Sequence, residues 1–86
     1  MTLDQFSLLS EEVQLAYVQR RGHYIARRWD DVHQAVLLYH LPGGFFVEVN
    51  YDVDKNEVTF LYPFEAGSAD DRLEDYAMFV KLPDDL

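Results

Sequence analysis

The sequence predicts an α+β protein with an N-terminal helix, a four-stranded antiparallel meander sheet and a short C-terminal helix. Two observations predict this class. Apolar residues recur with a period of 3.6 after Ser10, with a period of 2 between residues 23 and 64, and with a period of 3.6 again after Ser68. The predicted strands are joined by short turns, which connect antiparallel strands because parallel neighbours need long crossovers. Eighty-six residues suit one domain, so we expect a single α+β domain over residues 1–86.

The N-terminal region carries two helix-start signals. Thr2 and Gln5 have the spacing of a capping box, which predicts a short helical turn. Ser10 is a good N-cap for a helix over residues 10–21, whose first turn holds two glutamates and whose last turn holds two arginines, in agreement with the helix dipole. Gly22 follows, and we expect it to end the helix in a left-handed conformation.

The C-terminal region has a weaker helical pattern. Ser68 is a suitable N-cap, and two aspartates follow it in the expected first turn. Apolar side chains then recur at helical spacing, at Leu73, Tyr76, Ala77 and Val80. Pro83 ends whatever element precedes it.

Four segments between the helices have the alternation of strands, and they cover residues 23–29, 35–41, 45–53 and 57–64. The aspartates at 30–31 predict the first turn. A two-residue turn at Lys55-Asn56 predicts pairing of the last two strands through Val53–Val58, Tyr51–Phe60, Val49–Tyr62 and Val47–Phe64. In the last strand Val58, Phe60, Tyr62 and Phe64 would then face the first helix.

The segment Pro42-Gly43-Gly44 lies between the two middle strands. As a three-residue turn it pairs Leu41 with Phe45, and likewise Tyr39 with Val47 and Leu37 with Val49, all on one apolar face. A phosphate-binding loop requires glycines that lead from a strand into a helix. These glycines lead into a strand, so the sequence predicts a hairpin corner.

Composition excludes several classes of protein. The chain has no cysteine, which excludes disulfides and favours a reducing compartment. Its formal net charge of −9, from 16 acidic and 7 basic residues, repels nucleic acid and anionic lipid. We see no secretory signal pattern at the N-terminus and no apolar run of transmembrane length. We therefore expect a cytoplasmic protein with neither nucleic acid nor membrane as its partner.

Two sets of residues have side chains of the kind that bind metal ions. Residues 52–60 begin like a calcium loop, with oxygen ligands at Asp52, Asp54 and Asn56. Glu57 stands where such a loop needs glycine, and Pro63 stands where it needs a bidentate glutamate. The three histidines, His23, His33 and His40, have no zinc-site spacing. We expect no metal and no cofactor.

Catalysis and nucleic-acid binding have equally weak signals. The serines Ser7, Ser10 and Ser68 lie near helix starts, where hydroxyls act as caps, and none lies in a nucleophile elbow. We expect no catalytic residue.

The segment RRGHYIARRW (20–29) mixes arginines with aromatic residues, as proteins that bind single-stranded nucleic acid do. Arg27 and Arg28 project to opposite faces of a strand, so we expect ion pairs with acidic residues of the sheet instead.

The face of the sheet directed away from the first helix is unusually apolar. If Tyr39, Val47, Tyr51 and Phe60 face the helix, the side chains that face away include Val36, Leu38, Phe46 and Leu61. Exposed faces of antiparallel sheets are usually polar. Either the C-terminal helix or another chain is expected to cover these four residues, and they form a candidate interface.

Several segments together resemble a known group of proteins. They are "F…LS.E" near the start, "G.YIARR", "LYHL..GFFVEV.YD", "NEV…F" and "LEDY". In these segments the chain resembles short, single-domain bacterial α+β proteins of unknown function. The resemblance implies a fold and no activity.

The function with most support from the sequence is a non-catalytic module that binds a protein partner or a second copy of itself as a homodimer. A small metal-dependent or hydrolytic enzyme that uses the histidines and acidic residues is the alternative from another class. A third hypothesis is an acidic inhibitor that mimics nucleic acid for a basic protein.

Overall fold

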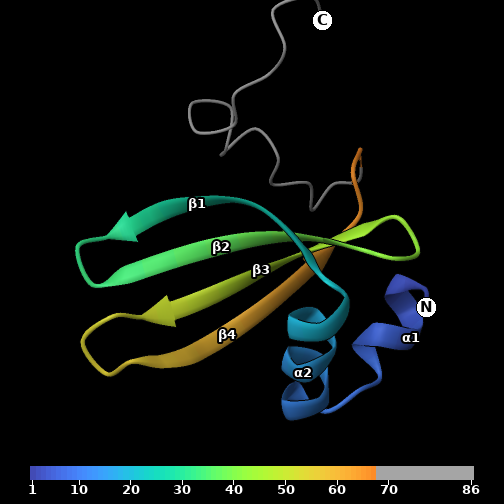
Figure 1. Cartoon of the computed structure of the whole chain (residues 1–86), viewed down its shortest axis with the longest axis horizontal. Coiled ribbons are helices and arrows are strands. Elements are labelled where there is room, and N and C mark those ends of the chain that lie inside the picture. The colour runs from blue at the N-terminus through green and yellow to red at the C-terminus, as the bar shows by residue number, and fades with distance from the viewer. Residues whose placement is uncertain (68–86) are drawn as a thin grey trace, which may run out of the picture.

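The computed structural model describes residues 1–67, which form two helices and one sheet (Figure 1). The helices are α1 (Leu3–Ser7) and α2 (Glu11–Arg21), and the strands are β1 (His23–Asp31), β2 (Gln34–Leu41), β3 (Phe45–Asp52) and β4 (Glu57–Phe64). The sheet order is β1-β2-β3-β4 and each strand is antiparallel to the next. This confirms the predicted N-terminal helix and antiparallel meander. The helix predicted after Ser68 lies outside the described residues.

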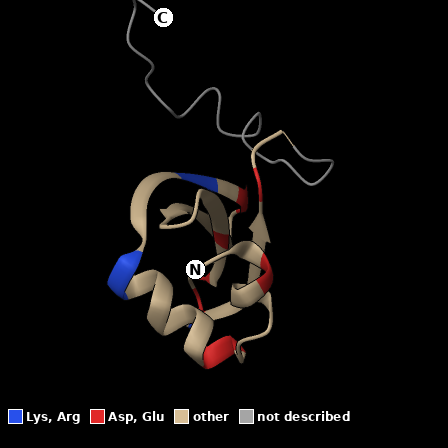
Figure 2. Cartoon of the chain, turned by 90° about the vertical axis from the view of Figure 1, so that its right-hand side faces the viewer, with Lys and Arg blue, Asp and Glu red and all other residues tan. Residues whose placement is uncertain are grey.

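Both helix starts follow the predicted capping. The Thr2 hydroxyl accepts a hydrogen bond from the Gln5 N–H at 3.2 Å, and the Gln5 side chain accepts one from the Thr2 N–H at 2.9 Å. Ser10 caps α2 by accepting from the Val13 N–H at 3.3 Å. Figure 2 shows the acidic first turn and the basic last turn at opposite ends of α2. Within residues 1–67, no helix has the length and apolar character needed to cross a membrane.

The predicted left-handed conformation of Gly22 is wrong. Gly22 is extended, with φ −72° and ψ 139°, and its N–H donates to the Val18 carbonyl at 2.7 Å. Glycine is needed there for space, because a Cβ atom would overlap the Val18 carbonyl oxygen and lie 3.1 Å from the Tyr39 ring. The chain therefore passes from α2 into β1 through the single residue Gly22.

The β2–β3 hairpin has the predicted register. Leu41 pairs with Phe45, and the pairing continues without irregularity to Gln34 and Asp52. Gly43 and Gly44 have φ values of +110° and +83°, and the Gly44 N–H donates to the Leu41 carbonyl at 3.1 Å. The two glycines therefore form a hairpin corner, as predicted.

The β1–β2 turn differs by two residues from the prediction. Asp30 and Asp31 belong to β1, and the turn is formed by Val32 and His33. The Asp31 carboxylate accepts from the His33 N–H at 2.6 Å and from the Gln34 N–H at 2.9 Å. Asp31 is therefore the last residue of β1 and holds the turn that follows it. The turn lies two residues closer to the C-terminus than predicted.

The predicted register of the β3–β4 hairpin is wrong. Asp52 pairs with Glu57 across a four-residue loop, because the Asp52 carboxylate accepts from the N–H groups of Asp54 and Lys55, both at 3.0 Å. Asn56 has φ +57°, in keeping with its turn position. The Asp52 carboxylate thus ends β3 before the expected Lys55-Asn56 turn.

A β-bulge then reverses the faces of β4. Val58 pairs with Tyr51, Thr59 is the extra residue, and Phe60 pairs with Asn50. From the bulge onward Leu61 faces the helices, whereas Phe60, Tyr62 and Phe64 face away from them. The expectation that these three aromatic residues face the helix is therefore wrong, and only Val58 keeps its predicted direction.

The helices pack on one face of the sheet. The helix-side core contains seven buried residues, which are Phe6, Val18, Leu41, Phe45, Val47, Val49 and Leu61. Both helices lie near one end of the sheet, and the β1–β2 and β3–β4 loops extend beyond them at the other end (Figure 1). The end of the helix-facing surface near these two loops therefore has no helix over it among residues 1–67.

Candidate interaction surface

The second face of the sheet, directed away from the helices, has an apolar cluster of its own. We call it the outer face. Its buried members are Ala26, Val36, Leu38 and Phe64, and its partly buried members are Ile25, Phe46 and Tyr62. Neither α1 nor α2 contributes a residue to this cluster. The outer face is therefore an apolar surface on which no helix of residues 1–67 packs.

The four residues predicted as an interface do not form one surface. Val36 and Leu38 lie on the outer face with no exposed area, and Phe46 lies beside them, partly buried. Leu61 lies on the opposite face, in the helix-side core, where it is 7% exposed. The prediction that Leu61 faces outward is wrong, because it did not include the bulge at Thr59.

A row of aromatic rings crosses the outer face. The ring centroids are separated by 4.9 Å for His40 and Phe46, 5.5 Å for Phe46 and Phe64, 6.0 Å for Phe64 and Tyr62, and 6.3 Å for Tyr62 and Phe60. We call these five residues the aromatic row. The row ends at Phe60, which is 53% exposed. Sequence reasoning missed it because the predicted register directed three of its members to the helices.

A buried ion pair lies among these apolar side chains. Arg28 Nη2 donates to Glu48 Oε2 at 3.1 Å, and Arg28 Nη1 lies 3.6 Å from Asp30 Oδ1. The side chains of Arg28 and Glu48 are 15% and 3% exposed. The pair confirms the expectation that an arginine of β1 interacts with an acidic residue of the sheet.

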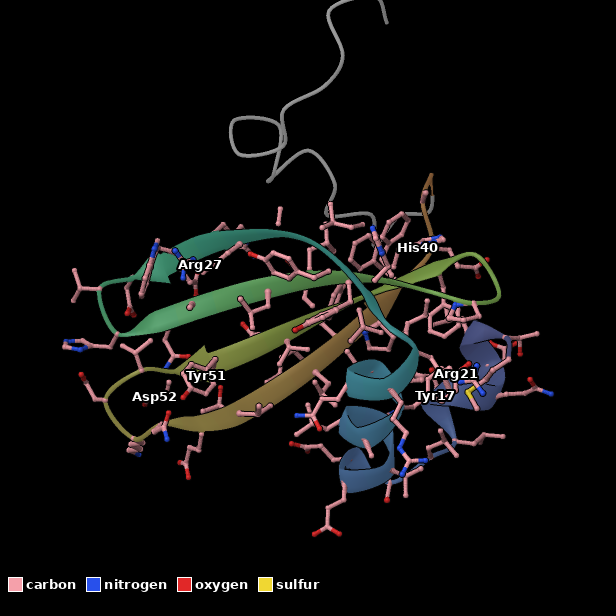
Figure 3. All side chains as sticks on the ribbon, viewed as in Figure 1. Tyr17, Arg21, Arg27, His40, Tyr51 and Asp52 are labelled. Atoms are coloured by element: carbon pink, nitrogen blue, oxygen red, sulfur yellow. The ribbon has the colours of Figure 1, made fainter. Side chains whose placement is uncertain are left out.

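The arginines of residues 20–28 do not gather in one patch. Arg27 lies on the helix side of β1, with its guanidinium carbon 5.6 Å from the centroid of the Trp29 ring. Arg28 lies on the outer face, as predicted from strand alternation. Figure 3 places Arg21 beside the helices and Arg27 toward the other end of β1. A continuous basic surface, as single-stranded nucleic acid requires, is therefore not formed by these side chains.

The histidines and Asp52, for which the sequence predicted no metal site, have other positions and contacts. His23 and His40 are opposite each other across β1 and β2, whereas His33 lies in the loop at the other end of the strands and contacts Asp54. Asp52 holds the N–H groups of its own turn. Within residues 1–67, no group of three or more acidic or histidine side chains is arranged to hold a metal ion.

Two further features of the sheet are the Tyr24–Tyr39 contact and a hollow near the end of β1. Burial, with a smaller contribution from Tyr24, raises the pKa of Tyr39 above its ordinary value of 10.0. The Tyr24 and Tyr39 rings are 5.7 Å apart and meet edge to face. Farther along β1, a hollow of about 430 Å³ is lined by Trp29, Asp31 and Val32.

Comparison of the chain with known proteins found no matching family model, no matching curated protein and no matching solved structure. The resemblance to short bacterial α+β proteins of unknown function therefore stays a prediction.

Proposed function

We propose that this chain is a non-catalytic protein-interaction module that pairs with a second copy of itself as a homodimer. The observation that carries the proposal is the aromatic row, which ends in the half-exposed ring of Phe60 on a face where no helix of residues 1–67 packs. Aromatic side chains are enriched at the centres of protein interfaces. A twofold axis through this face would pack one row against the other.

The interface proposed from the structure differs in its members from the one expected from sequence. Val36 and Leu38 form the buried floor, and Phe46, Tyr62 and Phe60 supply the accessible part. Leu61 is not part of it, because it belongs to the helix-side core. The proposed interface therefore lies nearer to β4 than the sequence suggested.

A non-catalytic role is supported by the structural contacts of three carboxylates. Asp31 and Asp52 hold the N–H groups of the two loops, and Glu48 pairs with Arg28. These contacts give each of the three carboxylates a structural role in a turn or in the sheet. The net charge of −9 supports a protein partner over nucleic acid or an anionic membrane, and the lack of cysteine supports a cytoplasmic location.

The proposal is tested by the solution mass of the full chain at high micromolar concentration, measured by light scattering. We expect twice the chain mass of 10.1 kDa. Phe60→Glu should return the mass to that of the monomer, since the charge would be buried at the interface. Leu8→Glu is the matched control, because Leu8 is an apolar residue that is 87% exposed near the helices.

A mass of 10.1 kDa for the unchanged chain at every concentration would overturn self-association. A dimer that persists in a folded Phe60→Glu variant would overturn the outer-face interface. Circular dichroism of each variant shows whether it is folded.

A further inference from the structure

The sheet has two edges, and they differ in how readily they could accept another strand. Among residues 1–67, β1 pairs with β2 only and β4 pairs with β3 only. β4 contains Pro63, which has no N–H to donate, and the bulge at Thr59, and both features hinder further pairing. β1 has register shifts at Ile25 and Asp30, and the stretch between them, 26–29, is regular. The more open edge is therefore a short regular segment of β1.

The side chains beside this segment offer two adjacent contacts. Arg27 and Trp29 are two positions apart in β1, so both lie on the helix side of the strand. Figure 3 places Arg27 toward the end of the sheet that the helices do not reach. Trp29 is 50% exposed and Val32 is 78% exposed, and both line the 430 Å³ hollow. The hollow is shallow and open to solvent, and the guanidinium carbon of Arg27 lies 5.6 Å from the centroid of the Trp29 ring that lines it.

The positive charge of Arg27 affects which kind of segment can pair with the β1 edge. The ion pairs formed among residues 1–67 involve Arg28 and His33, and none of them involves Arg27. An antiparallel second copy of β1 that paired about the middle of the strand would place Arg27 of one chain opposite Arg27 or Arg28 of the other. Like charges opposite each other destabilise a strand pair, and opposite charges stabilise it. The edge therefore favours an acidic segment over a second copy of this chain.

We propose that the β1 edge binds a short extended segment of a partner protein as an added strand. Backbone hydrogen bonds to residues 26–29 supply the pairing, as in other cases of β-strand addition. An acidic side chain of the segment lies beside Arg27, and an apolar side chain two positions away enters the hollow at Trp29. This surface is at the opposite edge of the sheet from β4, which carries Phe60, and the proposal goes beyond the homodimer of the preceding subsection.

The test uses two synthetic peptides that differ only in charge, Ac-Thr-Val-Thr-Glu-Thr-Val-Thr-NH2 and the same peptide with lysine in place of glutamate. Backbone amide shifts of the ¹⁵N-labelled full chain are recorded during titration to millimolar peptide. We expect the glutamate peptide to shift the amides of residues 26–29 and the Trp29 indole, and to bind roughly tenfold more tightly than the lysine peptide. Arg27→Glu should reverse that preference. Arg21→Glu should leave it unchanged, because Arg21 is the last residue of α2 and lies away from residues 26–29.

Two results would overturn the proposal. One is the lack of shifts in β1 with the glutamate peptide, or shifts centred on the aromatic row instead. The other is a charge preference that Arg27→Glu does not alter in a variant whose spectrum shows it to be folded. Neither result bears on the homodimer, which the solution mass tests separately.

Discussion

Replacing Glu48 with leucine should destabilise the protein, because it removes one partner of a buried ion pair. Arg28 and Glu48 are 3.1 Å apart, with side chains 15% and 3% exposed. At an effective dielectric constant of about 20, charges at this distance attract by roughly 5 kcal/mol. Desolvation of each ion costs several kcal/mol, so the net contribution of the intact pair is small. Removing one ion leaves the other desolvated without its main partner, which costs about 3–5 kcal/mol.

Asp30 reduces that cost, because its carboxylate lies 3.6 Å from Arg28 and is 66% exposed. We therefore expect Glu48→Leu to lower the free energy of unfolding by about 3 kcal/mol, the lower end of the range for a broken buried pair. For a chain of this size the total is roughly 4–13 kcal/mol, so the loss is large.

Urea denaturation followed by the fluorescence of Trp29 measures this effect. With a slope of about 1–3 kcal/mol per molar urea, the midpoint should fall by roughly 1 M or more. The double variant Arg28→Met, Glu48→Leu is the matched control, since it removes both charges and should recover most of the loss. A midpoint for Glu48→Leu close to that of the unchanged chain would refute the reasoning, and so would a double variant that is less stable than Glu48→Leu alone.

Three further predictions concern stability. Phe6→Ala should lower the free energy of unfolding, measured by urea denaturation, by about 3–5 kcal/mol, because Phe6 has no exposed area. Leu8→Ala, at an 87% exposed position, should lower it by under about 0.5 kcal/mol. Equal losses for the two variants would contradict this prediction. Gly43→Ala should lower the free energy of unfolding by more than about 1 kcal/mol, because Gly43 has φ +110° and a Cβ atom would overlap the Met1 carbonyl. An unchanged melting temperature of this variant would contradict the prediction. Burial raises the pKa of Tyr39 above 10.0, so the unfolded chain ionises first, and the stability present below pH 10.0 should be lost as pH rises through the folded pKa. Tyr39→Phe should remove that part of the alkaline loss, and an identical pH profile of stability would show that Tyr39 does not cause it.

The features predicted correctly from the sequence are those in which one local rule decides the outcome. The capping box at Thr2 and the cap at Ser10 need only a side chain and a nearby N–H group. The β2–β3 hairpin is decided by two glycines at positive φ and by alternation that agrees in both strands.

The β3–β4 hairpin could not be predicted in this way, because two turn signals compete in the same few residues. Asn56 at positive φ agrees with the expected two-residue turn, and Asp52 agrees with a longer loop because its carboxylate binds two N–H groups at 3.0 Å. The longer loop also places Tyr51 where its hydroxyl contacts the Asn56 side chain. The second arrangement satisfies more polar groups, and sequence patterns alone do not weigh them.

Both candidate surfaces depend on bulges that alternation cannot reveal. In the expected register Phe60, Tyr62 and Phe64 would all lie under the helices, on the face that already holds Phe6 and Phe45, whose rings are 5.4 Å apart. The extra residue in β4 sends those three rings to the outer face instead. In β1 the extra residue at Asp30 ends the regular stretch just after Trp29. One inserted position in β4 therefore decides on which face Phe60, Tyr62 and Phe64 are presented, because every residue beyond it changes face. β1 has two such positions, Ile25 and Asp30, and Trp29 lies in the regular stretch between them.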